Sequence, residues 1–204
     1  MFRNMLCLLA FLGLAACGAV DVKNASDAEI AQARFVAGGP STITLYTVVS
    51  TRSGSGAHTG LLINGSERVM FDPAGSWYHP TLPERQDVHY GVTDRMISYY
   101  IDYHARETFN VIEQTVTVSP EIAELTIARA KAYGAVPQAQ CANSVSSILR
   151  GVPGFESLPS TWFPNKLSEA FAQLPGASYT LTTDDDADNN HGVLMVQANG
   201  EPAL

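Results

Sequence analysis

The sequence predicts one α+β domain, built of antiparallel strands and helices, behind an N-terminal secretion signal. Three observations predict this class. Segments rich in β-branched residues gather between residues 41 and 72 and recur at 108–118. Two segments with helix-capping signals follow them, at 119–133 and 138–150. The order of strands, helices and then further strand is typical of an α+β fold, and a hydrophobic fraction of 46% suits one globular domain.

The first 16 residues are predicted to be a secretory signal peptide. Arg3 precedes an apolar run from Met5 to Leu14, which is too short to span a bilayer well and ends in small residues. The next cysteine completes the tetrapeptide Leu-Ala-Ala-Cys17, which resembles a bacterial lipobox. That resemblance implies cleavage before Cys17 and acylation of both its sulfur and its new amino group.

Lipidation would decide where the protein resides. Several acyl chains anchor a protein stably, and no later segment is long and apolar enough to span a membrane. Residues 17–40 are therefore expected to be a lipidated tether, and residues 41–204 the folded domain, held in a bacterial cell envelope and facing the periplasm. Gly18, where an acidic residue could stand, favours the outer membrane. An ordinary signal peptide with an incidental cysteine is the alternative.

The charge of the chain excludes one class of partner. The full sequence has 12 basic and 20 acidic side chains and a formal net charge of −8. Loss of Arg3 with the signal peptide would move this charge to −9. An acidic protein of this kind is a poor nucleic-acid binder, so no nucleic-acid partner is expected.

The first half of the domain is predicted to supply most of the sheet. β-Branched residues mark its strands, and apolar residues at three- and four-residue spacing mark its main helix. The expected elements are a short helix at 27–34, a strand at 41–49, a flexible loop at 51–56, paired strands at 57–63 and 67–72, a long loop at 73–92, a helix at 94–105 and a strand at 108–118.

The second half is predicted to be mainly helical. Ser119 caps a helix that has Pro120 in its first turn and ends at Gly134. Three further elements are expected after it: a helix that starts near 138–140 and ends at 150, a helix at 165–174, and a closing hairpin of strands at 177–183 and 191–197.

Cysteine usage singles out Cys141. Cys7 would leave with the signal peptide and Cys17 would be lipidated, so Cys141 is the sole remaining thiol and no intramolecular disulfide can form. It lies in the first turn of its predicted helix, where unpaired N–H groups and the helix dipole stabilise a thiolate. The same N–H groups can receive an oxyanion. Cys141 is therefore a candidate nucleophile, and a small buried hydrophobic residue is the alternative.

A cysteine nucleophile needs a base, and the chain has five histidines. His79 and His89 fall in the long loop and are expected to be solvated, and His104 falls on the apolar face of its helix. His58 and His191 each begin an apolar strand. His58 is favoured because a carboxylate can be placed opposite it, whereas His191 lies near the chain end without such a partner.

The partner predicted for His58 is Asp72. If Asn64-Gly65-Ser66 form a three-residue loop, Ile63 pairs with Glu67, and residue 58 then faces residue 72. Directly opposed residues share one face of the sheet, with Cβ atoms about 4.5–5.5 Å apart. A carboxylate there would orient the imidazole and stabilise its charged form, and a glycine two residues after the histidine leaves room for it. A loop of another length would break the alignment, and a simple turn at Asp72 is the alternative.

Three motifs together resemble the circularly permuted papain-like cysteine hydrolases of the NlpC type. The motifs are His58-Thr59-Gly60-Leu61-Leu62-Ile63, Phe71-Asp72-Pro73-Ala74-Gly75 and Gln140-Cys141-Ala142-Asn143-Ser144. In that family the histidine strand precedes the cysteine helix, as it does here over residues 42–150. The resemblance implies an antiparallel sheet packed against helices, a nucleophile at a helix N-terminus, and a cleft between them.

By position in these motifs, the resemblance assigns Cys141 as nucleophile, His58 as general base and Asp72 as the orienting residue. Many permuted members carry His, Asn, Gln or Glu at the third place, so aspartate departs from the family in residue type. Three side chains are open candidates for an oxyanion donor: Gln138, Gln140 and Tyr46.

The predicted function is an envelope cysteine hydrolase that cleaves an amide bond, first of all in a peptidoglycan stem peptide, through a thioester acyl-enzyme. The expected partners are the membrane, through the lipidated N-terminus, and peptidoglycan. A lipid ester hydrolase or acyltransferase resembling lecithin–retinol acyltransferase, and a non-catalytic binding lipoprotein, are the alternatives.

Neither a cofactor nor a metal is expected. The acidic segment 184–190 suggests calcium, but the sixth and twelfth positions from Asp184 hold Asn189 and Met195 in place of the glycine and the acid of an EF-hand loop. One cysteine with scattered histidines does not match the ligand spacing of a zinc site.

Overall fold

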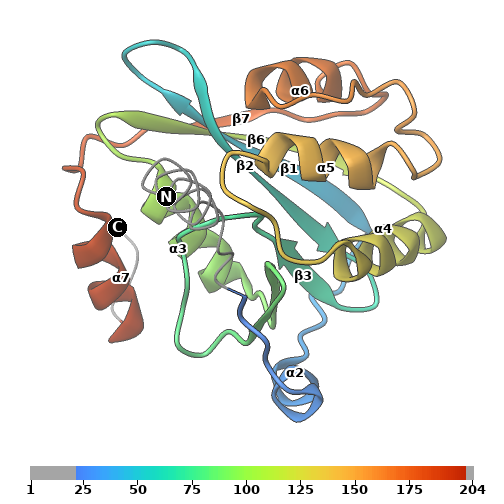
Figure 1. Cartoon of the computed structure of the whole chain (residues 1–204), viewed down its shortest axis with the longest axis horizontal. Helices are drawn as coiled ribbons and strands as arrows, with labels where there is room; N and C mark the ends of the chain where they lie inside the picture. The colour runs from blue at the N-terminus through green and yellow to red at the C-terminus, as the bar shows by residue number, and fades with distance from the viewer. Residues whose placement is uncertain (1–21, 201–204) are drawn as a thin grey trace, which may run out of the picture.

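The computed structural model describes residues 22–200, and the predicted signal peptide and Cys17 lie outside that range. Within it the chain forms an α+β fold, an open antiparallel sheet of seven strands with six helices (Figure 1). The elements are α2 (Asp27–Ala33), β1 (Thr42–Ser50), β2 (Gly56–Asn64), β3 (Arg68–Phe71), β4 (Glu84–Arg85), β5 (Val88–Tyr90), α3 (Asp94–His104), β6 (Phe109–Thr117), α4 (Pro120–Tyr133), α5 (Cys141–Leu149), α6 (Pro164–Phe171), β7 (Thr180–Thr182) and α7 (Asn190–Ala198). Across the described range, every helix is too short or too polar to cross a membrane.

The sheet follows the order β4-β5-β3-β2-β1-β6-β7, and every neighbouring pair is antiparallel. At its centre, β1 pairs along its length with β2 on one side and β6 on the other. By contrast, β3 pairs only with Leu61–Asn64 of β2. The outer edge of β2 from Gly56 to Gly60 therefore has no strand partner in the described part of the chain, and the candidate site forms beside this open edge.

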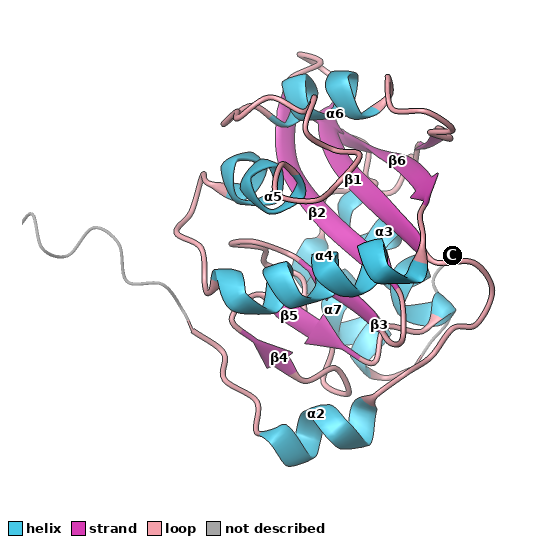
Figure 2. Cartoon of the chain, turned by 90° about the vertical axis from the view of Figure 1, so that its right-hand side faces the viewer, coloured by secondary structure: helices cyan, strands magenta, loops and turns pink. Residues whose placement is uncertain are grey.

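Helices cover both faces of the sheet (Figures 1 and 2). α4, α5 and α6 lie on one face, and α3 and α7 lie on the other. Alternation along the strands sends Leu45 and Leu61 into the core on the first face, and Tyr46 and Leu62 into the core on the second. Burying a large apolar side chain stabilises a fold by about 1.5–3 kcal/mol, so these two cores hold the helices to the sheet.

Most elements agree with the sequence predictions. The strands expected at 41–49, 57–63, 67–72 and 108–118 are confirmed as β1, β2, β3 and β6, and the helices expected at 94–105 and 119–133 are confirmed as α3 and α4. The hydroxyl of Ser119 accepts the N–H of Ile122, and Gly134 ends α4 with a φ of 90°. These caps satisfy helix-end groups that would otherwise lack a partner.

Two segments differ from the predictions. The region 73–92, expected to be a long loop, contains the short strands β4 and β5, which extend the sheet beyond β3. The segment 191–197, expected to be a strand in a closing hairpin, is helix α7. The Asn189 side chain caps this helix, and the buried Gln197 donates to the carbonyl of Tyr99 in α3 over 2.9 Å. The apolar run from which a strand was predicted thus forms a helix that packs against α3.

The β2–β3 hairpin also differs in register from the prediction. Ile63 faces Val69 rather than Glu67, because the turn lies one residue further along the chain than expected. The predicted direct opposition of His58 and Asp72 is therefore wrong.

A turn displaced by one residue changes the pairing partner of each β2 residue by two positions on β3. A shift of two preserves the face of every side chain, because strand alternation has a period of two. Leu61 and Phe71 form the last pair of the hairpin, so Asp72 comes to lie across from Gly60. From there its carboxylate is diagonal to His58 on the same face. A Cβ on Gly60 would come within 3.4 Å of Asp72 Oδ1, so the carboxylate uses space that a side chain would restrict.

Residues 22–40, the described part of the expected tether, run along the sheet. Asn24 forms an isolated bridge with Arg85, and the Phe35 carbonyl accepts the N–H of Arg68 over 2.9 Å. The Ser26 hydroxyl caps α2 in a reciprocal arrangement with Glu29. This segment therefore contacts the β3–β4 side of the domain.

Candidate active site

Cys141 is the first residue of α5 and is 7% exposed. Backbone N–H groups of Ala142 and Thr59 donate hydrogen bonds to its sulfur. The first belongs to the opening turn of a helix, where N–H groups have no acceptor within the helix. The second belongs to the segment of β2 that β3 leaves unpaired. The sulfur therefore lies between a helix N-terminus and an open strand edge.

The turn before α5 has a constrained backbone. Ala139 has a φ of 64°, a left-handed conformation that costs a non-glycine residue about 1–2 kcal/mol. Gln140 follows as the N-cap, but its side chain makes no capping hydrogen bond. The N–H groups of the first turn are consequently left for other acceptors, and the sulfur is one of them.

His58 and Asp72 meet through a short hydrogen bond. His58 Nε2–H donates to Asp72 Oδ1 over 2.6 Å, and the Tyr100 hydroxyl donates to the same oxygen over 3.0 Å. The side chain of Asp72 is fully buried, whereas that of His58 is 15% exposed. Since Nε2 is bound to the carboxylate, Nδ1 is the nitrogen left to form the hydrogen bond between His58 and the Cys141 thiol. The three side chains selected from the sequence are thus linked in the order Cys–His–Asp.

The backbone around Asp72 holds its carboxylate in place. Its N–H donates to the Asp87 carbonyl over 2.8 Å, and its carbonyl accepts the N–H of Gly75 over 3.0 Å. The side-chain Oδ2 of Asp87 accepts the N–H groups of Ala74, over 3.0 Å, and Val136, over 2.9 Å. Asp87 thereby joins the segment that carries Asp72 to the segment that leads into α5.

Electrostatic interactions shift the pKa values of all three groups. Burial alone would lower the pKa of His58, but the charge of Asp72, their hydrogen bond and the Cys141 thiol raise it to about 10. Burial would raise the pKa of Asp72, but the charged His58 ring holds it well below its ordinary value. Burial would also raise the pKa of Cys141, but the hydrogen bond and the charge of His58 lower it. The raised pKa of the imidazole and the lowered pKa of the thiol both favour a thiolate–imidazolium pair over the neutral pair.

Two residues of α3 complete the surroundings of this pair, and sequence reasoning gave neither of them a role. Tyr100 is fully buried and binds Asp72. His104, 9% exposed, stacks on His58 with ring centroids 5.5 Å apart and 8° between the ring planes. Their spacing of four residues places both on one helix face. The sequence contained that spacing, but only the docking of α3 shows which strand residues the face meets.

The remaining histidines differ from expectation. His79 and His89 are buried, at 7% and 2% exposed, so the prediction that they are solvated is wrong. His79 Nε2–H donates to the carbonyl of Gln197 in α7 over 3.1 Å. His89 lies edge-on to Trp77, and burial lowers its pKa. His191 is exposed and belongs to a helix, which removes the strand geometry that made it a candidate.

A cavity of about 360 Å³ opens beside His58. Its walls include both stacked imidazoles, the hydroxyls of Ser76 and Tyr103, and the apolar side chain of Phe109. Cys141 does not line it, so the cavity adjoins the histidine side of the thiolate–imidazolium pair. A substrate group could therefore bind here beside the general base.

The three side chains considered as oxyanion donors have different environments. Tyr46 is 1% exposed, and its hydroxyl is hydrogen-bonded to Glu113. Gln138 is exposed and Gln140 is half-buried. The backbone N–H groups directed at the sulfur are better placed than these, and sequence reasoning missed the one on β2 because the open edge of that strand depends on where β3 ends.

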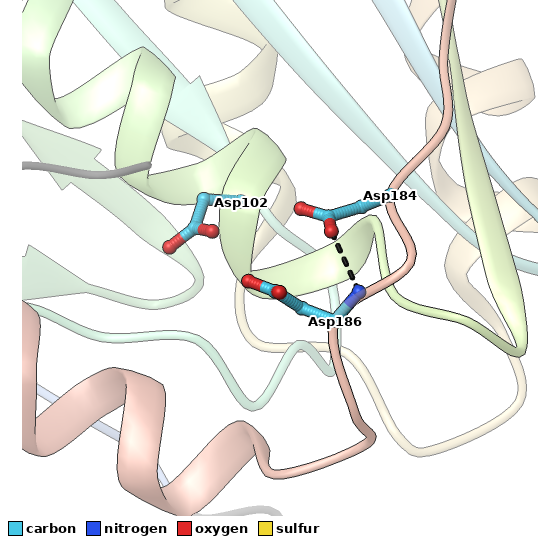
Figure 3. A group of neighbouring side chains, drawn as sticks. All are labelled: Asp102, Asp184 and Asp186. Atoms are coloured by element: carbon cyan, nitrogen blue, oxygen red, sulfur yellow. Dashed lines mark hydrogen bonds between the residues drawn. The ribbon is translucent and has the colours of Figure 1, made fainter.

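An acidic cluster lies outside the cysteine site (Figure 3). Asp102 from α3 and Asp184 and Asp186 from the loop before α7 bring carboxylate oxygens within 4.8 Å of one another. Arg106, whose side chain is 4% exposed, binds Asp102 over 2.7 Å and Asp186 over 3.2 Å. Its guanidinium offsets part of the negative charge of the cluster, and two of the three carboxylates thus have a cationic partner within the described chain.

Comparisons of the chain with protein-family models, with curated proteins and with solved structures gave no match. The assignment of a function therefore depends on the geometry of the site.

Proposed function

We propose that the protein is a cysteine hydrolase of the permuted papain-like, NlpC type, which cleaves an amide bond through a thioester acyl-enzyme. The observation that carries the proposal is the linked set of Cys141, His58 and Asp72, with its 2.6 Å bond between imidazole and carboxylate. The family resemblance is supported by the helix that begins at the cysteine and by the antiparallel sheet against which it packs.

Each member of the set has a defined step. The Cys141 thiolate attacks the carbonyl carbon, a C–S bond forms, and the carbonyl oxygen becomes an oxyanion that the N–H groups near the sulfur can stabilise. His58 gives its Nδ1 proton to the leaving nitrogen, and the C–N bond breaks. Water then gives a proton to Nδ1 of His58 and attacks the thioester carbon. The C–S bond breaks, the acid is released and the thiolate is restored. Asp72 keeps the ring oriented and stabilises its charge.

A peptide of the cell envelope is the proposed substrate, with the stem peptide of peptidoglycan as the first candidate. The proposal of this compartment rests on the signal sequence and lipobox that end at Cys17, through which the protein would be anchored in the outer membrane and face the periplasm.

A lipid ester, or acyl transfer between lipids, is the second candidate. Trp162 and Phe163 precede α6 and are 55% and 61% exposed. Asn165 in α6 donates to the Gly54 carbonyl over 2.6 Å, so the segment that carries these aromatic side chains continues into a helix that contacts the loop before β2. Exposed apolar groups of this kind often mark a binding surface. Dependence of turnover on acyl-chain length, with no cleavage of peptides, would favour this candidate.

The pH dependence of Cys141 alkylation tests the proposed mechanism. Iodoacetamide is applied between about pH 4 and pH 10, and the modified peptide is quantified by mass spectrometry so that only Cys141 is scored. We expect fast alkylation well below about pH 8, because the thiolate forms there, whereas the unfolded protein should follow an ordinary thiol. Inertness of the folded protein until about pH 8 would overturn the mechanism and leave a non-catalytic binding role.

Digestion of purified peptidoglycan tests the substrate. Soluble products of the intact protein and of Cys141→Ala are compared by liquid chromatography and mass spectrometry. Stem-peptide fragments that appear only with the thiol present are the expected result. Equal product patterns for both proteins would exclude this substrate.

A further inference from the structure

The side chain of His104 forms part of the wall of the cavity beside His58, and one of its ring nitrogens has no hydrogen-bond partner in the described chain. Its Nδ1–H donates to the Tyr100 carbonyl over 2.8 Å, because a carbonyl oxygen can only accept. This bond fixes the tautomer and leaves Nε2 with a lone pair. His104 lines the cavity, and within residues 22–200 its Nε2 has no hydrogen-bond partner.

The ring of His104 is neutral at physiological pH. Burial lowers its pKa to about 4; the charge of Asp72 opposes this effect, and the charge of His58 adds to it. The two stacked imidazoles therefore differ in role: His58 is the charged donor of the pair, and His104 is a neutral acceptor beside it.

The position of the cavity indicates which part of a substrate reaches it. In acyl transfer the carbonyl carbon binds the sulfur, while the leaving atom must come within hydrogen-bonding reach of the protonated base. The remainder of the leaving group then extends past the base. The cavity is lined by His58 and not by Cys141, so it lies where that remainder would go.

We propose that this cavity is the subsite for the leaving group in acylation and for the acyl acceptor in deacylation, and that His104 Nε2 accepts a hydrogen bond from either group. The proposal rests on the hydrolase function proposed above. The ligand class is an uncharged amine, alcohol or amide-bearing group with an N–H or O–H donor, because no lysine, arginine or carboxylate lines the cavity. The hydroxyls of Ser76 and Tyr103 add polar contacts.

The acceptor step is a balanced acyl transfer. The N–H of an amine acceptor gives its proton to the neutral His58 as the nitrogen attacks the thioester carbon. The C–N bond forms, the C–S bond breaks, and the thiolate of Cys141 is restored beside a protonated ring.

Competition between water and glycinamide tests the subsite in the full-length protein. p-Nitrophenyl acetate is the acyl donor, and the burst of p-nitrophenolate measures acylation of Cys141. Acetylglycinamide, quantified by mass spectrometry, measures transfer to the amine. We expect transfer to saturate with glycinamide, and to be weaker with glycine, which carries a carboxylate in place of the carboxamide.

Two substitutions of His104 distinguish the contributions of its two ring nitrogens. His104→Asn keeps an N–H that can donate to the Tyr100 carbonyl but has no atom at Nε2, whereas His104→Gln places an amide oxygen near Nε2. Loss of one hydrogen bond should raise the half-saturating glycinamide concentration of His104→Asn about 3–10-fold. His104→Gln should recover most of this loss, and His191→Asn, on the exposed face of α7, should bind glycinamide as the unaltered protein does.

The outcomes test the hydrolase function and the leaving-group subsite separately. No burst, or a burst that persists in Cys141→Ala, overturns the hydrolase function and the subsite with it. A Cys141-dependent burst with the same half-saturating concentration in His104→Asn and the unaltered protein overturns the subsite alone. A linear, unsaturated dependence on glycinamide also overturns the subsite.

Discussion

Asp72→Asn should disable the thiol while the side chains around it stay in place. The amide has nearly the size of the carboxylate and can still accept from the Tyr100 hydroxyl, but it carries no charge. The rise in the pKa of His58 from 6.5 to about 10 corresponds to about 5 kcal/mol of preference for the charged ring. The charge of Asp72 is the largest of the interactions that raise this pKa, so most of the preference should be lost.

In this variant the charge of Asp72 no longer opposes the effect of burial on the pKa of His58, and only the weaker interactions with Cys141 still raise it, so the ring should be neutral at about pH 7. The Cys141 thiol then loses the positive charge that lowers its pKa. Each unit of increase in that pKa reduces the thiolate fraction about tenfold at lower pH, so alkylation by iodoacetamide at about pH 6 should slow at least tenfold. Asp94→Asn removes a carboxylate that is 89% exposed, and this charge-matched control should alkylate as the unaltered protein does.

The interaction between His58 and Asp72 should also make the stability of the fold depend on pH. The pKa of His58 is raised on folding, so its contribution is fully present below pH 6.5 and is lost as pH rises through about 10. The pKa of Asp72 is lowered, so its contribution is present above pH 3.8 and is lost on acidification. In a Cys141→Ala background, which removes the titration of the thiol, Asp72→Asn should lower Tm most between about pH 4 and 6.5. In the alkylation experiment with Cys141 present, identical pH profiles for Asp72→Asn and the unaltered protein would refute the role given to the Asp72 charge.

Three further substitutions test other parts of the structure. A Cβ on Gly75 would overlap Oδ2 of Asp72, so Gly75→Ala should displace the carboxylate and slow alkylation at about pH 6; a profile unchanged in a folded variant would contradict the geometry. Arg106→Met removes the cation of the acidic cluster and should reduce the free energy of unfolding by about 3–5 kcal/mol in urea titrations, and a loss below about 1 kcal/mol would show that the cluster does not need it. Ala139→Gly relieves a left-handed backbone and should raise that free energy by about 0.5–1 kcal/mol; an unchanged or lower value in the same titrations would show that Ala139 is not strained.

The hairpin shows how far a sequence argument could place the site. Alternation put His58 and Asp72 on the same face of the sheet, and that part of the prediction survived a register error of two residues. The count itself failed because the turn lies one residue later than expected, and turn position depends on what the neighbouring residues contact. The contact then forms diagonally across Gly60, with Tyr100 from a distant helix as a second donor.

The sequence by itself determined the local features: the strands β1, β2, β3 and β6, the main helices with their caps, and the choice of Cys141 as the one thiol at a helix start. Those features follow from residues close together in the chain, where propensity, periodicity and capping act. Only the tertiary structure decided the open edge of β2, the stacking of His104 on His58, the burial of His79 and His89, and the helical state of α7. Each of these depends on segments far apart in sequence, which must bury their apolar faces and satisfy their hydrogen bonds together.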